Sequence, residues 1–137
     1  MSTDVPNGSS LRVLLVEDSS LLAARLTELI RRLPDVELVD TADTESAALA
    51  SIAVSSPDVV ILDLHLRSGS GFGVLRSLAH GKQRPKIVIL TNFGLPAYRR
   101  EAESLGVAAF LDKSNDYYRL PALLQGFADE RAPGSAH

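Results

Sequence analysis

Five short apolar runs alternate with longer helical patterns along the chain, and this alternation constrains the fold more than any other feature. Most of the runs are nearly continuous in Val, Leu and Ile, which is typical of strands that are buried on both faces of a parallel sheet. The expected strands are Leu11–Val16, Val36–Val39, Val59–Leu62, Ile87–Leu90 and Val107–Leu111.

Helical patterns fill the connections between these strands. A stripe of Leu and Ile from Leu22 to Leu33 predicts a first helix, with Ser19 or Ser20 as its N-cap. Further helices are expected at Thr44–Val54, at Phe72–His80, at Pro96–Leu105 and around Leu120, Leu124 and Phe127. Connections of this length suit helical crossovers rather than hairpins. The chain is therefore expected to be an α/β protein with an open, doubly wound parallel sheet.

Length and composition narrow the class further. The 137 residues suffice for one domain, expected at 11–128, with polar tails at 1–10 and 129–137 that are predicted to be disordered. The absence of Cys excludes a disulfide framework and a thiolate zinc site. The net charge of -3 is mixed along the chain, so no nucleic-acid partner is expected. No apolar run approaches the ~20 residues of a membrane span and no signal peptide is evident, so the expected location is the cytoplasm.

Polar residues follow four of the expected strands, where the carboxyl ends of parallel strands form a ligand-binding edge. Glu17 and Asp18 follow the first strand, and Asp63 follows the third. Thr91 ends the fourth strand, and Lys113 comes after the fifth. Clustered carboxylates repel one another unless a cation joins them, and Mg²⁺ is the natural guest of an all-oxygen site.

This set of side chains predicts phosphoryl transfer to an aspartate. The Asp63 carboxylate is the candidate nucleophile, while the Lys113 ammonium and the Thr91 hydroxyl would contact the phosphoryl oxygens. A single aspartate at a strand end is more often a turn residue or a helix cap. The hypothesis therefore depends on the joint placement of all the groups at one edge.

These motifs make Leu11 to Phe127 resemble the receiver domain of bacterial two-component response regulators. The resemblance lies in an acid-pair strand, a phospho-acceptor segment, a hydroxyl strand and a lysine strand, namely Val13–Asp18, Val59–Leu66 with Gly71, Val88–Thr91 and Gly106–Lys113. It implies a flavodoxin-like, five-stranded parallel sheet of order 2-1-3-4-5 with helices on both faces.

The resemblance also implies a role for each site residue. Asp63 would accept phosphate, and Mg²⁺ would be bound by Glu17, Asp18, Asp63 and the backbone carbonyl of His65. Thr91 and Lys113 would contact the phosphoryl group. Thr91 and the aromatic Phe110 would form a switch that changes an output surface on the fourth helix, fifth strand and fifth helix. In this chain that surface would comprise Tyr98, Arg99, Ala102, Asp112 and Tyr117.

Four positions depart from the usual pattern of the family, and none removes a catalytic group. Arg67 and Ser114 stand where Pro is usual, Asn92 where a small residue is common, and Ser70 where Asp or Asn is common. These changes bear on the amplitude of switching. Bulky groups at His65 and Phe93, on the expected path of the hydrolytic water, predict slow self-dephosphorylation. The glycine-rich segment Gly69–Gly73 lacks the spacing of a dinucleotide fingerprint and is interpreted as a flexible loop that enters a helix.

The predicted function is a single-domain regulator that catalyses its own phosphorylation and dephosphorylation. Its phosphoryl donor would be a sensor histidine kinase or a histidine phosphotransfer protein, and it would signal to a downstream protein target or through a phosphorelay. A weak homodimer stays open, as does a degenerate receiver that binds a protein partner independently of phosphate. A phosphatase of the haloacid dehalogenase type is disfavoured, because Glu17-Asp18-Ser19-Ser20 lacks the two required aspartates at the right spacing.

Overall fold

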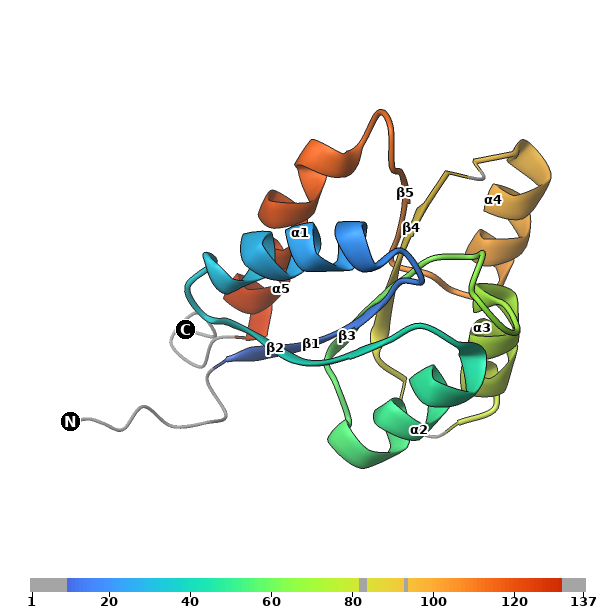
Figure 1. The fold of residues 1–137 in the computed structure, drawn as a ribbon, viewed down its shortest axis with the longest axis horizontal. Coiled ribbons are helices and arrows are strands. Elements are labelled where there is room, and N and C mark those ends of the chain that lie inside the picture. Colours follow the sequence, from blue (N-terminus) through green and yellow to red (C-terminus); the bar gives the residue numbers. More distant parts are fainter. Residues whose placement is uncertain (1–9, 82–83, 93, 132–137) are drawn as a thin grey trace.

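A computed structural model describes residues 10–81, 84–92 and 94–131 of the chain, which form a five-stranded parallel sheet covered by helices (Figure 1). The strand order is β2-β1-β3-β4-β5, and every pair of neighbours is parallel. This confirms the predicted fold and order. The strands are β1 (Leu11–Val16), β2 (Val36–Ala42), β3 (Val59–Leu62), β4 (Lys86–Thr91) and β5 (Ala109–Asp112).

Polar caps set the starts of the first three helices. The side chains of Ser19, Thr44 and Ser70 each accept a hydrogen bond from a backbone N–H of the helix that follows. The fourth helix instead begins with Pro96 in its first turn. The helices are α1 (Ser20–Arg31), α2 (Glu45–Ser55), α3 (Gly71–Ala79), α4 (Pro96–Ser104) and α5 (Leu120–Arg131), with a 3₁₀ turn η2 (Tyr117–Arg119) before α5.

Alternate residues of the central strands feed two hydrophobic clusters, one on each face of the sheet. Helices α1 and α5 pack on one face, where Leu26, Ile30, Leu120 and Leu124 are fully buried. Helices α2, α3 and α4 contribute Ala48, Val74, Leu75 and Ala102 to the other face. This arrangement leaves the carboxyl ends of β1, β3, β4 and β5 as a shared edge between the two helical layers.

Several boundaries differ from those expected; strand β5, for example, begins at Ala109 rather than at Val107. Strand β2 continues to Ala42, because a shift in its register with β1 lets Ala42 pair with Val16. Helix α5 continues to Arg131, so residues 129–131, which were assigned to a disordered tail, are helical. Arg131 forms an ion pair of 2.8 Å with Asp58 and donates to the Ser10 carbonyl, which holds the end of this helix against the sheet. The rest of both predicted tails lies outside the described residues.

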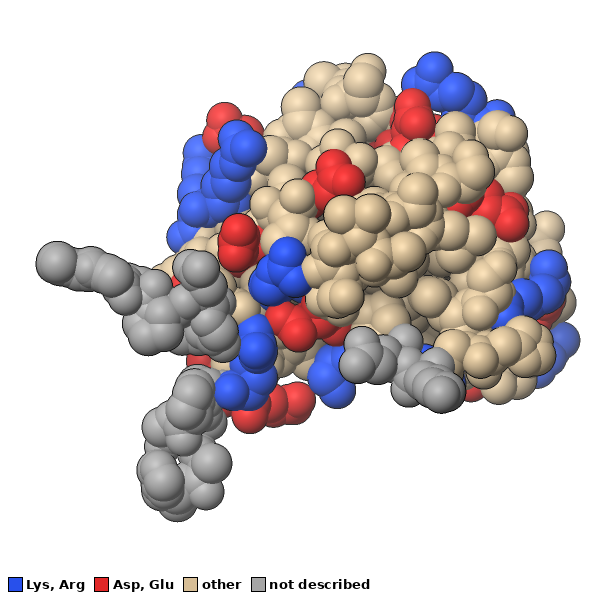
Figure 2. Space-filling model, turned by 90° about the horizontal axis from the view of Figure 1, so that it is seen from below, with Lys and Arg blue, Asp and Glu red and all other residues tan. Residues whose placement is uncertain are grey.

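The surface carries charges of both signs. On the face that Figure 2 shows, basic and acidic side chains of the described residues are interspersed rather than gathered by sign. Within the described ranges, no helix combines the length and the apolar character needed to cross a membrane.

Candidate functional site

The register of the strands brings the predicted site residues to one edge of the sheet. Val16 pairs with Leu62, so Glu17 and Asp63 leave neighbouring strands side by side. The Asp63 N–H donates to the Val16 carbonyl at 3.1 Å, which continues the ladder by one residue. On the other side of the edge, the Lys113 N–H donates to the Thr91 carbonyl at 2.9 Å.

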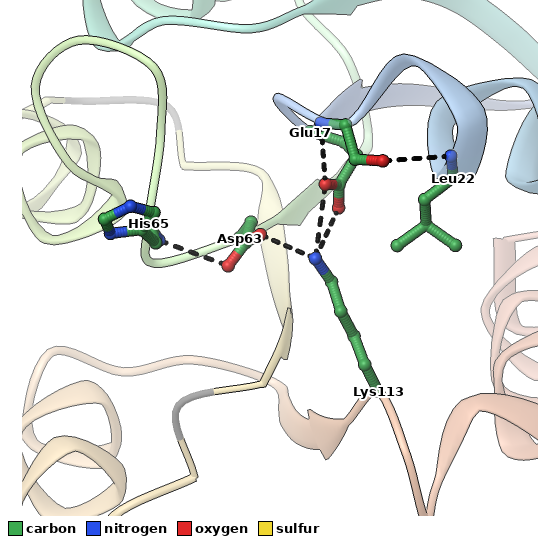
Figure 3. A network of polar contacts seen from close by, with 6 residues as sticks. Glu17, Leu22, Asp63, His65 and Lys113 are labelled. Atoms are coloured by element: carbon green, nitrogen blue, oxygen red, sulfur yellow. Dashed lines mark hydrogen bonds and ion pairs between the residues drawn. The ribbon is translucent and has the colours of Figure 1, made fainter.

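The ammonium of Lys113 lies between two buried carboxylates, as Figure 3 shows. Its Nζ is 2.7 Å from Asp63 Oδ2 and 2.9 Å from Glu17 Oε1. Glu17 is 5% exposed and Asp63 4% exposed, and the Lys113 side chain is 12% exposed. Because water screens these buried charges poorly, the electrostatic attraction within each of the two ion pairs is stronger than in a surface pair. Lys113 thus offsets part of the negative charge of the acid cluster from the β5 side.

Burial and pairing have opposite effects on the pKa of Glu17 and on that of Lys113, and both pKa values are raised. Burial raises the pKa of Glu17 above its ordinary value of 4.5, although hydrogen bonds from Lys113 and the Ser19 N–H partly offset this effect. Burial acts to lower the pKa of Lys113, but hydrogen bonds to Asp63 and Glu17 outweigh it and raise that pKa above 10.5. Lys113 is therefore firmly protonated, while the charge on Glu17 is held at a cost.

Three carboxyl groups of the site can meet around one ion. Glu17, Asp18 and Asp63 each offer an oxygen, and these oxygens lie within 4.8 Å of one another. A cavity of about 310 Å³ opens beside Glu17 and Asp18 and is also lined by Asp43 and Arg67. An all-carboxylate set of this kind matches the ligand preference of a hard divalent cation. The residues present therefore fit a metal site that is open on one side.

The backbone after Asp63 turns tightly around its carboxylate. The His65 N–H donates to Asp63 Oδ1 at 3.1 Å, so the two carboxylate oxygens face different donors (Figure 3). Gly71 packs beneath this turn and its N–H donates to the Leu64 carbonyl at 3.0 Å. A Cβ on Gly71 would lie closer than 3.0 Å to the Asp63 carbonyl oxygen and to the Leu64 Cα. Glycine at position 71 is thus required by close packing against the site.

The two predicted switch residues are buried. Thr91 is fully buried, and Phe110 is 6% exposed. The guanidinium carbon of Arg99 lies 4.5 Å from the centre of the Phe110 ring, which indicates a cation–π contact. Tyr98, the neighbour of Arg99 on α4, meets the ring of Phe72 edge-on at 5.7 Å. Aromatic and guanidinium groups therefore join α4 to both β5 and α3.

The predicted output surface needs one correction. Ala102 was expected on that surface, but it is fully buried in the core beneath α4. Helix α4 is largely polar, and Ala102 belongs to the apolar stripe that it packs on the sheet. Tyr98 is 37% exposed, and the other members of the set, Arg99, Asp112 and Tyr117, are partly exposed. The Asp112 carboxylate also accepts hydrogen bonds from the N–H groups of the following turn.

The structure gives local roles to the residues that depart from the family pattern. The Ser70 hydroxyl caps α3 by accepting from the Gly73 N–H at 3.1 Å. Arg67 forms an exposed ion pair of 3.2 Å with Asp43, a residue that the sequence analysis did not connect with the site. Asn92, which follows Thr91, is exposed. The peptide bond before Ser114 is trans, as are the other peptide bonds of the described residues. Phe93 lies outside the described residues.

Comparison with known proteins identifies the family. The family profile described as "Response regulator receiver domain" matches residues 13–125. The transcriptional regulatory protein CitB of Klebsiella pneumoniae is 29% identical over 90% of this chain and 53% of its own length. Protein-glutamate methylesterase/protein-glutamine glutaminase 5 of Myxococcus xanthus is 36% identical over 74% of this chain and 27% of its own. The chain thus spans about a quarter to a half of the length of these relatives.

Solved structures agree with this assignment. A two-component response regulator of the LuxR family from Aurantimonas sp. SI85-9A1 superposes with a TM-score of 0.80 at 25% identity, covering 93% of both chains. A DNA-binding response regulator of the same family from Staphylococcus aureus gives a TM-score of 0.79 at 25% identity over 86% of this chain and 98% of its own. The chain therefore belongs to the response regulator receiver domain family of two-component signal transduction.

Proposed function

We propose that this protein is a phospho-accepting signalling switch in which Asp63 takes up the phosphoryl group. The observation that carries the proposal is the buried Lys113 ammonium between Asp63 and Glu17, with Asp18 completing the acid cluster beside an open cavity. Charged groups that are buried together beside a cavity are typical of functional sites, and in open parallel sheets ligands bind at the carboxyl ends of the strands. The arrangement is that expected of a site which binds a cation and an anionic donor together.

The chemical step joins an Asp63 oxygen to phosphorus. One carboxylate oxygen of Asp63 attacks the phosphorus atom of the donor, a new O–P bond forms, and the bond between phosphorus and the leaving group breaks. The leaving group departs with that bond's electron pair: imidazole nitrogen for a phosphohistidine donor, or carboxylate oxygen for acetyl phosphate. Lys113 and Thr91 then contact the phosphoryl oxygens, and the product is an aspartyl phosphate. Water would later break the new O–P bond, which releases inorganic phosphate and restores the Asp63 carboxylate.

Glu17, Asp18, Asp63 and the carbonyl of His65 would hold Mg²⁺. When bound, the ion neutralises the charge that gathers on the phosphoryl oxygens. Lys113 contacts two of these carboxylates, so a cation held there would compete with its ammonium for them. The ammonium would then be available to contact the phosphoryl group.

Phosphorylation would reach the surface through β4 and β5. Thr91 pairs in register with Asp112, which directly precedes Lys113, so movement of either site residue strains the same strand pair. Phe110 lies on β5 under Arg99, and a change in its packing would alter α4. The output surface would comprise Tyr98, Arg99, Asp112 and Tyr117, without Ala102. Phosphorylation would shift the balance between two existing conformations of this surface rather than create a new surface.

The proposal extends to partners and location. A sensor histidine kinase or a histidine phosphotransfer protein would donate the phosphoryl group in the cytoplasm. A downstream protein, or the next member of a phosphorelay, would read the output surface. The receiver would act as a single domain, whereas the family members matched here include much longer proteins.

Intact-mass spectrometry tests the phosphoryl transfer. Incubation with acetyl phosphate and Mg²⁺ should add the mass of one phosphoryl group, and either EDTA or Asp63→Asn should abolish the gain. Asp35→Asn is a matched control, because Asp35 is exposed at the opposite end of the sheet and asparagine tolerates its positive φ of 60°. A gain that survives in Asp63→Asn would contradict the assignment of the acceptor.

The same proteins distinguish a phosphorylation-dependent switch from a degenerate receiver. Pull-down of partners with and without a beryllofluoride mimic should show binding that depends on the mimic and on Asp63. Binding that is equal in both states, with no mass gain from acetyl phosphate, would favour a phosphate-independent binding module instead.

A further inference from the structure

The glycine-rich segment after β3 encloses a carboxylate from another helix. Glu45 is the first residue of α2, and its Oε1 accepts a hydrogen bond of 3.0 Å from the Ser70 N–H, 25 residues away. The Glu45 N–H in turn donates to the Ser68 carbonyl at 3.0 Å. The first residue of α2 is therefore tied to the loop between β3 and α3 through both its backbone and its side chain.

The absent side chains of Gly69 and Gly73 leave the space that Glu45 occupies. A Cβ on either glycine would have Glu45 atoms as its three nearest neighbours, two or more of them closer than 3.0 Å. Gly69 also has a positive φ of 76°, which independently favours glycine, but Gly73 does not. Gly73 lies inside α3, where glycine weakens a helix relative to alanine. The space that the Glu45 carboxylate needs explains why position 73 is a glycine.

The site of the carboxylate is also electrostatically suited to it. Glu45 reaches the N-terminus of α3, where backbone N–H groups lack helical partners and negative charge is favoured. Ser70 caps the same end with its hydroxyl. The segment that the sequence suggested to be a flexible loop is thus held by two side chains at the start of α3.

A short path of contacts joins Glu45 to the phospho-acceptor. Ser70, whose N–H bonds Glu45, pairs with His65 in an isolated antiparallel bridge. The His65 N–H donates to Asp63 Oδ1 at 3.1 Å. A second tie runs beside the first, because the Arg67 N–H donates to the Asp43 carbonyl at 3.3 Å and their side chains form an ion pair.

We propose that Glu45 is a positioning residue for Asp63: its carboxylate, seated between Gly69 and Gly73, fixes Ser70 and through it His65, the residue that orients the acceptor. The functional half of this inference rests on the proposed phosphoryl transfer. Loss of Glu45 should let the loop from 64 to 70 move, which misplaces both the N–H and the carbonyl of His65. Binding of Mg²⁺ and transfer to Asp63 should then weaken although neither reacting group has changed.

A double-mutant cycle tests the seat of the carboxylate. Thermal unfolding in EDTA would be compared for the wild type, Gly73→Ala, Glu45→Ala and the double variant. Gly73→Ala should lower the midpoint when Glu45 is present, because its Cβ would displace the carboxylate from its hydrogen bond with the Ser70 N–H. In the Glu45→Ala background the same change should raise the midpoint, since alanine favours the helix. The same sign in both backgrounds would overturn the proposed seat. The cycle does not depend on phosphoryl transfer.

Calorimetry and kinetics test the functional half. Magnesium chloride would be titrated into each variant at a temperature well below its unfolding midpoint. The initial rate of phosphorylation by acetyl phosphate would be measured at saturating Mg²⁺. Glu45→Ala should weaken Mg²⁺ binding about three- to tenfold, below the 10–100-fold loss typical of a direct neighbour of a metal ligand. Glu45→Gln keeps an accepting oxygen for Ser70 and should stay within about twofold of the wild type.

Glu28→Ala is the matched control, because Glu28 is an exposed helical glutamate on α1. Unchanged Mg²⁺ affinity and rate in Glu45→Ala, with the wild type active, would overturn the positioning role, as would a Glu45→Gln variant impaired as much as Glu45→Ala. A wild type that neither binds Mg²⁺ nor gains a phosphoryl group would instead refute the proposed function, while the stability cycle would still report on Glu45.

Discussion

Replacement of Lys113 by methionine should destabilise the metal-free protein by about 3 kcal/mol at pH 7. Methionine keeps the length of the side chain and removes the charge that neutralises Glu17 and Asp63, both at most 5% exposed. Removing one partner of a buried ion pair typically costs about 3–5 kcal/mol. The variant can avoid a larger loss of stability by protonating Glu17, so the cost of that protonation is an upper limit on the loss. Holding a carboxyl of ordinary pKa 4.5 neutral at pH 7 costs roughly 3.4 kcal/mol, at 1.36 kcal/mol per pH unit.

The same reasoning predicts how the loss depends on conditions. The upper limit on the stability that Lys113→Met loses falls by about 1.4 kcal/mol per pH unit on acidification. The variant should therefore recover most of its lost stability by about pH 5. Added Mg²⁺ should also restore stability, and by more than it stabilises the wild type, because the ion replaces the missing positive charge.

Urea unfolding followed by far-UV circular dichroism is the appropriate assay, since the chain contains no Trp for fluorescence. Lys86→Met is the control: Lys86 is exposed at the far end of the sheet, and the described contact of its ammonium is a cation–π contact with Phe127. Its loss should be roughly 0.5–1 kcal/mol. A Lys113→Met deficit no larger than that of Lys86→Met at pH 7, or one that persists at pH 5, would refute the proposed neutralisation of the acid cluster.

Three further predictions follow from the same site. Gly71→Ala should cost roughly 1–3 kcal/mol in thermal unfolding, because its Cβ meets the Asp63 carbonyl, whereas Gly126→Ala, with open space around it in α5, should be stabilising. Glu17→Gln should raise the unfolding midpoint in EDTA, since burial opposes the charge on Glu17, and should reduce the gain that Mg²⁺ gives; a lower midpoint in EDTA would contradict this. The raised pKa of Lys113 means that its charge persists up to pH 10.5 and is lost as the pH rises through the higher folded value. On the alkaline side of pH 7, the difference in unfolding free energy between wild type and Lys113→Met should therefore shrink only above pH 10.5, and a decline between pH 7 and pH 10.5 would contradict this.

The meeting of the site residues could be predicted because topology alone determines it. Parallel strands that are buried on both faces end at a common edge, so side chains that follow β1, β3 and β5 must approach one another. The sequence does not contain the distances. Lys113 was expected to contact a phosphoryl group, but its pairing with Glu17 and Asp63 in the metal-free protein appears only once the 2.7 Å and 2.9 Å contacts are known.

The errors arise where a residue's environment comes from a distant part of the chain. The composition of residues 129–137 suggested a disordered tail, yet Arg131 meets Asp58, 73 positions earlier, and α5 continues to it. The local sequence also cannot show that the Glu45 side chain fills the space beside Gly73. Ala102 could have been assigned correctly, since it is an apolar residue on the sheet-facing stripe of an otherwise polar helix.

The position of Lys113 suggests why charge at the acceptor should change the far side of the sheet. In the metal-free state its ammonium holds the end of β5 against Asp63 and Glu17, and its N–H holds β5 to Thr91. A cation held by the same carboxylates would compete with the first of these attachments, and a phosphoryl group on Asp63 would offer the ammonium a different partner. Phe110 and Asp112 lie on this short strand, and Phe110 is covered by Arg99 of α4. The electrostatic requirement of the site is therefore coupled by a four-residue strand to the helix whose surface we expect partners to read.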